Sequence, residues 1–341
     1  MLNSRKKDNG TVGLDIGKYS IKVVSLLKES NKKTLTAYNV KKVPAGKSIQ
    51  EQEALIKEAL SEIDLHPRDV NLSISGLDVI VRFINFPKMT REQLDNALVF
   101  EAEKHIPFNV NDVILDSIIL GDLPDTGQMR VLLAAAKKEM VNSKVKLIES
   151  LNMSVNVMDI DIFAVFNAFT AGNKLQPDKA NAFLDIGHTQ TDLLIAIGEN
   201  PYFMRQIQIG GKDITSAIAK QLAVPVEKAE EYKHGIGLDK KEVIEAVDSS
   251  IAKVFDDMVK EIHLSFNYFE SNCNLEVDEI FCSGGAISQP RAMEYFSKQL
   301  GTPVKKWNPI DEIGIAETLS KTDIDSVASS LAVSVGLALR D

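Results

Sequence analysis

The sequences VGLDIGKYSIKVV (residues 12–24) and FLDIGHTQTDLLI (residues 183–195) share the word LDIG, and this repeat decides the fold. In both copies an apolar run precedes the word LDIG, polar residues follow it, and a second apolar run comes after them. The pattern predicts a β-hairpin whose tight turn lies at Gly17 in one copy and at Gly187 in the other. The chain should therefore build the same acidic hairpin twice, once in each half.

The two halves of the chain repeat one order of elements around these hairpins, with strands first and helices after them. Three strands at hairpin spacing are predicted in each half, over 11–17, 20–27 and 32–43 and again over 182–186, 191–197 and 202–209. The matching order indicates an internal duplication in an α/β chain. We expect a first lobe over 11–173 and a second lobe over 174–341, with a flexible segment over 1–10.

The composition argues against several classes of function. The net charge is -9 and the pI is near 5.2, whereas nucleic-acid and anionic-membrane binders usually show a basic surface. Cys273 and Cys282 form no C-x-x-C pair, and the histidines lack the H-x-x-x-H spacing of a zinc helix. The first ten residues lack the apolar run of a secretory signal, and no apolar run approaches the roughly 18 residues of a membrane span. We expect a cytoplasmic protein.

The aspartate before each turn glycine indicates a metal-dependent anion site. A glycine turn lets backbone N–H groups approach an anion closely, but an aspartate beside it would repel a phosphate unless a divalent cation lay between them. Mg²⁺ suits this role because it keeps several waters and needs only one or two carboxylates besides phosphate oxygens. Asp15 and Asp185 could then flank one hydrated Mg²⁺ on the phosphates of a nucleotide. Alternatively, each aspartate only caps its own turn.

Motifs along the whole chain resemble those of the actin-like ATPase superfamily. The two LDIG hairpins resemble its phosphate motifs, IFCSGGA (280–286) resembles its adenosine motif, and AEEYKHG (229–235) resembles the helix that supplies an acid and a lysine to the nucleoside. IGGKDITSAIAKQL (209–222) resembles the segment that opens the helical part of the second half. The resemblance implies a duplicated fold with two lobes around a nucleotide cleft. It also implies ATP and Mg²⁺ as ligands and a C-terminal helix (326–341) that crosses back to the first lobe.

The same resemblance assigns roles to individual residues. Asp15 and Asp185 would hold the Mg²⁺ through water, and Glu230 and Lys233 would contact the nucleoside. The other expected nucleotide contacts are Gly17, Lys18, Ser20, Lys22, Gly187, Thr189, Gly210, Gly211, Gly284 and Gly285. Lys22 aligns with a phosphate-binding lysine of actin, although on a strand it could equally point to solvent.

Departures from the superfamily pattern imply slow chemistry. Lys18 and Tyr19 stand where relatives tend to have Ser or Thr, so the Lys18 ammonium could either neutralise a phosphate or occupy the site. His188 stands where actin has an acid. Asp161 falls where relatives place the Gln or Glu that orients the attacking water, and its side chain is one methylene shorter. We expect ATP to bind, hydrolysis to be slow at most, and nucleotide to act mainly as a conformational ligand.

Within the superfamily, the sequence is similar to the PilM family of cytoplasmic type IV pilus assembly proteins. The similarity is carried by FEAEKHIPF (100–108), VLLAAAKKEMV (131–141), VNVMDIDIFAVFNAF (155–169) and GLALR (336–340). The first two stretches lie in an expected strand–helix–strand–strand insertion at about 77–152. PilM and the division protein FtsA share such an insertion in the first lobe.

The similarity to PilM implies a partner and a location. In that family the insertion and the neighbouring first-half sheet form a groove for the N-terminal tail of the inner-membrane protein PilN, and apolar pockets beside sheet edges suit such peptide capture. Phe83, Phe86, Phe100 and Phe108 fall in the insertion, either as core or as groove lining. The protein would be cytoplasmic, recruited to the inner membrane by this partner, with the pilus motor ATPases of twitching motility as further candidate partners.

Other functions stay open at this point. An FtsA-like protein would form filaments, but FtsA usually ends in an amphipathic membrane helix, and this sequence stops at Asp341 without one. A sugar or acetate kinase of the superfamily would need a further catalytic aspartate and an insertion of another type. The type II secretion protein GspL continues into a membrane span. Self-association also remains open.

Overall fold

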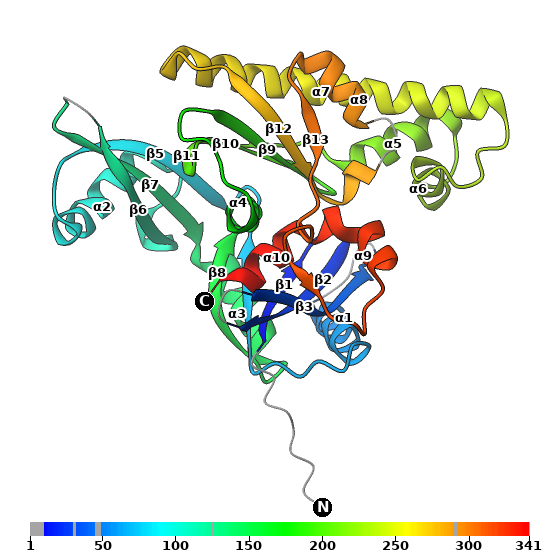
Figure 1. Ribbon diagram of the computed structural model, residues 1–341, viewed down its shortest axis with the longest axis horizontal. Coiled ribbons are helices and arrows are strands. Elements are labelled where there is room, and N and C mark those ends of the chain that lie inside the picture. Colours follow the sequence, from blue (N-terminus) through cyan, green and yellow to red (C-terminus); the bar gives the residue numbers. More distant parts are fainter. Residues whose placement is uncertain (1–9, 30–31, 45–48, 124–125, 289–291, 341) are drawn as a thin grey trace, which may run out of the picture.

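Two lobes, each built on its own mixed β-sheet, form the main body of the computed structural model, and a smaller third sheet stands beside them (Figure 1). The structure describes residues 10–29, 32–44, 49–123, 126–288 and 292–340. The predicted flexible segment over 1–10 lies almost entirely outside the described residues. The duplicated α/β architecture expected from the repeated hairpins is confirmed.

The sheet of the first lobe is six-stranded, in the order β14-β3-β2-β1-β4-β8. Its strands are β1 Thr11–Ile16, β2 Ser20–Glu29, β3 Lys32–Lys42, β4 Asp69–Ile74, β8 Ser154–Ile160 and β14 Gly314–Ile315. One face packs on α1 (Ile49–Ser61) and α3 (Lys138–Glu149) through a buried apolar core. The other face packs on α10 (Ala332–Leu339), which lies so close that a Cβ on Gly13 would come within 2.0 Å of the Ser334 carbonyl oxygen.

The sheet of the second lobe is five-stranded, in the order β11-β10-β9-β12-β13. Its strands are β9 Ala180–Ile186, β10 Thr191–Ile197, β11 Asn200–Ile207, β12 Val277–Ser283 and β13 Val304–Lys306. The helices on one face are α5 Gly211–Leu222, α6 Val226–Lys233, α7 Lys241–Cys273 and α8 Ala292–Leu300. On the other face, α4 (Asp161–Gly172) brings Phe166 and Phe169 against Phe183, so this helix joins the two lobes.

The two LDIG hairpins have the same register, as the repeated word predicts. Asp15 of β1 lies opposite Lys22 of β2, and Asp185 of β9 lies opposite Asp192 of β10. Each turn closes in the same way, since Gly17 N–H donates to the Ser20 carbonyl at 3.1 Å and the Gly187 N–H donates to the Gln190 carbonyl at 2.9 Å. The duplication therefore extends to the hydrogen bonds of the turns.

The third sheet, in the order β5-β7-β6, forms the predicted insertion together with one helix. Its elements are β5 Val79–Pro87, α2 Arg91–His105, the 3₁₀ turn η1 Val110–Asp112, β6 Val113–Leu123 and β7 Gln128–Lys137. Helix α2 starts at a capping box of Thr90 and Gln93 and packs its apolar stripe on one face of the sheet. The strand–helix–strand–strand order is confirmed, while the bounds at about 77–152 stay a prediction, since α3 within them packs on the first lobe.

The insertion phenylalanines divide between core and surface. Phe86 is buried, and Phe83 and Phe108 are half-buried against the cores on the two faces of the sheet. Phe100 is 72% exposed, because it lies off the stripe of Leu94, Leu98 and Ala102 that α2 buries. Most of these rings are therefore packing residues.

The chain returns to the first lobe before the predicted crossing helix over 326–341. Strand β14 pairs with β3 at Gly314↔Thr34, and Ile310 already lies in the core of the first lobe. The closing helix is divided into α9 (Lys321–Val327), the 3₁₀ segment η3 (Ala328–Leu331) and α10. Contrary to the expectation that no segment is long and apolar enough, Lys321–Leu339 could cross a membrane by length and composition, but 61% of its apolar window is buried inside the fold. It serves as a core element of the first lobe.

Candidate functional site

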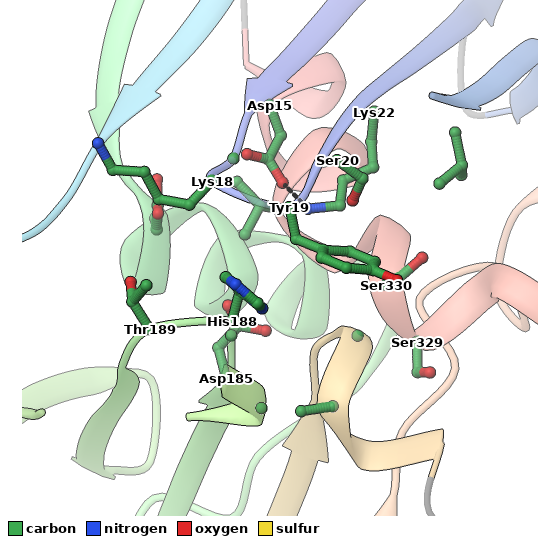
Figure 2. Close-up of a pocket in the computed structure, with 18 of the residues that line it drawn as sticks. Asp15, Lys18, Tyr19, Ser20, Lys22, Asp185, His188, Thr189, Ser329 and Ser330 are labelled. Atoms are coloured by element: carbon green, nitrogen blue, oxygen red, sulfur yellow. Dashed lines mark hydrogen bonds and ion pairs between the residues drawn. The ribbon is translucent and has the colours of Figure 1, made fainter. Parts of the chain in front are cut away.

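A cavity of ≈ 540 Å³ lies where the two lobes meet, within the usual size range of small-molecule sites. Both LDIG hairpins enter it, together with residues of α4, α5 and α6, the 3₁₀ turn η2 (Gly285–Ser288) and η3 (Figure 2). The predicted site residues that line it are Asp15, Gly17, Lys18, Ser20, Lys22, Asp161, Asp185, Gly187, Thr189, Gly211, Glu230, Lys233 and Gly285. The fold thus gathers residues from both halves of the chain into one site.

Two predicted contacts, Gly210 and Gly284, lie behind the cavity wall. A Cβ on Gly210 would come within 2.7 Å of the His188 carbonyl oxygen, and one on Gly284 would come within 2.4 Å of the Ile186 carbonyl oxygen. Gly284 also has a φ of +101°, in the region that favours glycine. Both glycines let neighbouring segments pack tightly against the second hairpin, so they shape the site from behind.

Carboxylates from both hairpins lie in a buried polar cluster within the cavity. Lys22 donates to Asp15 at 2.9 Å, and the Ser283 hydroxyl donates to Asp185 at 2.9 Å. Burial raises the pKa of the Asp15 carboxyl, with Lys22 opposing the shift and Asp161 adding to it. Burial also raises the pKa of Asp185 to about 6, with Ser283 opposing and Asp161 adding. Burial, and to a smaller extent the neighbouring Asp161, therefore disfavour the ionised form of both carboxyls.

Asp192 is a site residue that the motif assignment missed. It lines the cavity, is buried, and accepts hydrogen bonds from Gln190 on both carboxylate oxygens at 3.0 Å. Burial raises the pKa of Asp192 well above its usual value, and Asp161 adds to the shift. The repeat carried the signal, since Asp192 follows Asp185 at the same spacing at which Lys22 follows Asp15. At this position the first hairpin has a cation and the second has an acid.

The lysines of the first hairpin point in different directions. Lys22 lines the cavity rather than pointing to solvent; burial opposes its charge, but the Asp15 carboxylate raises the pKa of Lys22 above its ordinary value. Lys18 extends away from the Asp15–Lys22 pair, although it contributes to the cavity lining (Figure 2). Of the two, Lys22 is the one held beside the carboxylates.

Another part of the cavity wall is an ion-paired network on α6. Lys233 donates to both carboxylate oxygens of Glu230, at 2.6 and 2.7 Å, and to the Thr215 hydroxyl at 3.0 Å. Burial opposes the charge of Glu230, but hydrogen bonds from His234, Lys233 and Thr215 hold the pKa of Glu230 below its usual range. An ionised Glu230 is an acceptor suited to hydroxyl donors such as those of a ribose.

Asp161 begins α4 and adds to the raised pKa values of the hairpin aspartates. Behind it, Lys144 of α3 donates to the Ser73 carbonyl at 2.8 Å. Burial lowers the pKa of Lys144, with Asp161 and then Asp15 opposing the shift. Sequence reasoning missed Lys144 because it lies three residues beyond the end of the VLLAAAKKEMV motif (131–141).

The donor set fits a hydrated divalent cation. Burial first, and neighbouring carboxylates second, raise the pKa values of the hairpin aspartates, and a cation would offset both effects. Asp15 and Asp185 could hold such a cation through water, and its charge would favour their ionised forms.

The chain is similar to known proteins both in sequence and in structure. The sequence profile of the family described as "Type IV pilus assembly protein PilM" matches residues 13–341. A solved "PilM-PilN type IV pilus biogenesis complex" is similar over 97% of this chain and 98% of that chain, with a TM-score of 0.85 and 27% identity.

More distant solved structures share the actin-like fold. The ethanolamine utilization protein EutJ from Carboxydothermus hydrogenoformans is similar with a TM-score of 0.56 and 13% identity, over 97% of this chain and 89% of that chain. The archaeal actin homolog Ta0583 in complex with ADP is similar with a TM-score of 0.51 and 15% identity, over 96% of this chain and 98% of that chain. At these identities the likeness shows the fold alone.

Proposed function

The chain belongs to the PilM family of type IV pilus assembly proteins, and we propose that it is a cytoplasmic, nucleotide-binding adaptor. In this proposal it docks the N-terminal tail of a PilN-like inner-membrane protein, which recruits it to the membrane, and it connects that partner to the motor ATPases of twitching motility. The similarity to the PilM-PilN complex over nearly the whole of both chains carries the proposal.

The face of the insertion sheet opposite α2 offers the apolar surface that such a tail needs. Two rows of paired residues cross this face, Val79–Ala136–Ile114 and Phe83–Leu132–Ile118. The members on β5 and β7 pack inward in the cluster that contains α4, but on β6 Ile114 is 43% exposed and Ile118 is 54% exposed. Strand β6 is also the edge of its sheet. An extended peptide can pair along such an edge and place apolar side chains beside these isoleucines.

Replacement of Ile118 by aspartate is expected to weaken binding of the PilN-like peptide at least tenfold, because it places a charge in an apolar contact worth about 2 kcal/mol. Isothermal titration of the purified protein with a synthetic N-terminal peptide measures the change. Leu264→Asp is the matched control, since Leu264 is 56% exposed on α7 in the other lobe. Equal peptide affinities of the Ile118→Asp variant and the Leu264→Asp control would show that the PilN-like tail binds at a surface other than the one around Ile118.

The nucleotide of this proposal is Mg-ATP, with Asp15 and Asp185 holding the metal through water. The bound Mg²⁺ would supply charge neutralisation for the phosphates. Gly17, Gly187, Ser20, Thr189 and Lys22 would contact the phosphates, and Gly211, Gly285, Glu230 and Lys233 would contact the nucleoside. Asp161 would orient water weakly because of its short side chain, so that hydrolysis is slow at most.

In this proposal, bound nucleotide shifts the equilibrium between different arrangements of the two lobes. Asp161 lines the cavity and begins α4, which packs in the core shared by the second-lobe sheet and the insertion. Ser75 and Gly76 also line the cavity, only a few residues before β5 enters the insertion. A change at the nucleotide therefore has two direct structural connections to the peptide-binding sheet.

Affinity for Mg-nucleotide is expected to fall as the pH decreases through about 6, by up to about tenfold per pH unit. The reason is that the pKa of Asp185 is about 6 and only the ionised carboxylate serves the metal shell. The stability of the nucleotide-free protein should depend on pH in the opposite direction. The pKa of Asp185 in the folded protein exceeds the ordinary value of 3.8, so the Asp185 carboxyl adds to the free energy of unfolding at low pH and loses this contribution as the pH rises through about 6. Titrations at several pH values check the prediction, and the pH dependence near 6 should be weaker in Asp185→Asn.

A further inference from the structure

Tyr19 lies at the tip of the first hairpin and reaches the second one. Its ring centroid is 5.0 Å from that of His188, with the ring planes at 32°. Tyr19 belongs to the first-lobe hairpin and His188 to the second-lobe hairpin, so this contact crosses from one lobe to the other (Figure 2). Aromatic pairs at this separation attract each other beyond simple burial.

Cationic groups from both lobes surround the same ring. The Lys42 ammonium, from β3 of the first lobe, lies 5.4 Å from the ring centroid, and the Lys233 ammonium, from α6 of the second lobe, lies 5.9 Å from it. Burial raises the pKa of the Tyr19 phenol, with Lys42 opposing the shift and Glu230 adding to it. The ring is thus held by side chains of both lobes at once.

The ring also stands in the cavity that the proposed nucleotide would fill. Tyr19, Lys42, His188, Glu230 and Lys233 all line this cavity together with the hairpin aspartates. Glu230 and Asp185 line the same cavity as Tyr19 and His188, so a ligand that fills this cavity would contact the Tyr19–His188 pair.

We propose that Tyr19 is a latch that holds the two lobes together across the cleft, through His188 and the flanking lysines, and that a nucleotide opens it on entry. The interlobe contact stands on the structure alone, whereas its opening by nucleotide rests on the proposed function. The arrangement of the two lobes would then differ between the protein with bound nucleotide and the protein without it.

Hydrogen exchange of the nucleotide-free protein tests the contact directly. Tyr19→Ala should raise amide exchange in the second hairpin (183–195) about two- to tenfold, as expected for loss of one aromatic contact. Tyr19→Phe, which keeps the ring and removes only the hydroxyl, should raise it less than Tyr19→Ala does. His188→Ala should have the same effect on the first hairpin (12–24), and the double variant should add little to either single change, because both remove one contact.

A matched control is Tyr268→Ala, which removes a Tyr–Phe contact at 5.4 Å within the second lobe. The proposal is overturned when Tyr19→Ala leaves the second hairpin at its wild-type exchange, or when the control raises that exchange equally.

Stopped-flow binding of a fluorescent ATP analogue with Mg²⁺ tests the opening step. Tyr19→Ala should associate at least threefold faster than wild type and Tyr19→Phe.

An outcome in which Tyr19→Ala dissociates faster and binds more weakly would mean that the ring holds the nucleotide, and would overturn the latch. Absence of analogue binding by the wild-type protein would contradict the proposed function. The exchange experiment contains no nucleotide, so it decides the interlobe contact in that case too. The failure of one proposal is therefore distinguishable from the failure of the other.

Discussion

Replacement of Gly336 by alanine is expected to destabilise the protein by about 3 kcal/mol or more, because α10 leaves no room for a side chain where it crosses α4. A Cβ on Gly336 would lie 1.8 Å from the Ala164 carbonyl oxygen and 2.4 Å from its carbonyl carbon. Both atoms belong to the backbone of a buried helix and cannot turn aside, so the two helices would have to separate. The separation would open a core that includes Leu337 and Val333. Urea unfolding followed by circular dichroism measures the loss.

Gly285→Ala is the control for this prediction. A Cβ there would have no atom within 4 Å, so its stability should stay within about 0.5 kcal/mol of wild type. The two substitutions are chemically identical and differ only in the space around the added methyl group. Similar unfolding midpoints for both variants would contradict the close α4–α10 crossing on which the joining of the lobes depends.

Asp185→Asn is expected to lower Mg-nucleotide affinity about 10- to 100-fold, the usual cost of losing a group that orients a metal shell. The amide keeps the size of the side chain and its contact with Ser283 but removes the charge that the cation requires. Because that charge repels phosphate in the absence of metal, affinity for nucleotide without Mg²⁺ should fall less or even rise. Titrations with and without Mg²⁺ separate the two effects.

The control for the metal prediction is Asp278→Asn. Asp278 pairs with Lys179 and accepts the Ala180 N–H at 3.0 Å, on the second lobe but outside the cavity lining. Its substitution should leave the Mg²⁺ dependence of nucleotide binding unchanged. A loss of affinity as large as that of Asp185→Asn would point to a general disturbance of the second lobe.

The hairpins and the duplicated fold were predictable because they depend on local patterns, whereas the nucleoside side of the cavity was predicted from the family resemblance. Strand alternation and a turn glycine specify a hairpin, and a word that occurs twice specifies that both hairpins are alike. Asp192 was predictable in principle from the same repeat. The word LDIG contains only the aspartate that the two hairpins share. The residue seven positions after this aspartate differs in charge between the copies, Lys22 in the first and Asp192 in the second, so the shared word did not indicate it.

Tertiary contacts set the remaining features, and local patterns do not show them. The return of the chain at Ile310 depends on β14, a strand of two residues that exists only because β3 offers an unpaired edge. The positions of Gly210 and Gly284 behind the cavity wall depend on how closely distant segments approach the second hairpin. Lys144 of α3 acts on Asp161 and Asp15 only through its charge, and the sequence of α3 carries no sign of the strands it covers.

The most direct test of the adaptor function is a calorimetric titration of the purified protein with a synthetic N-terminal peptide of its candidate PilN-like partner, with and without Mg-ATP. We expect binding in at least one state, and a difference in affinity between the two states would measure the coupling of the cleft to the peptide site. Binding that Ile118→Asp weakens at least tenfold and Leu264→Asp preserves would locate the tail on the insertion sheet. Absence of binding in both states would contradict the adaptor function.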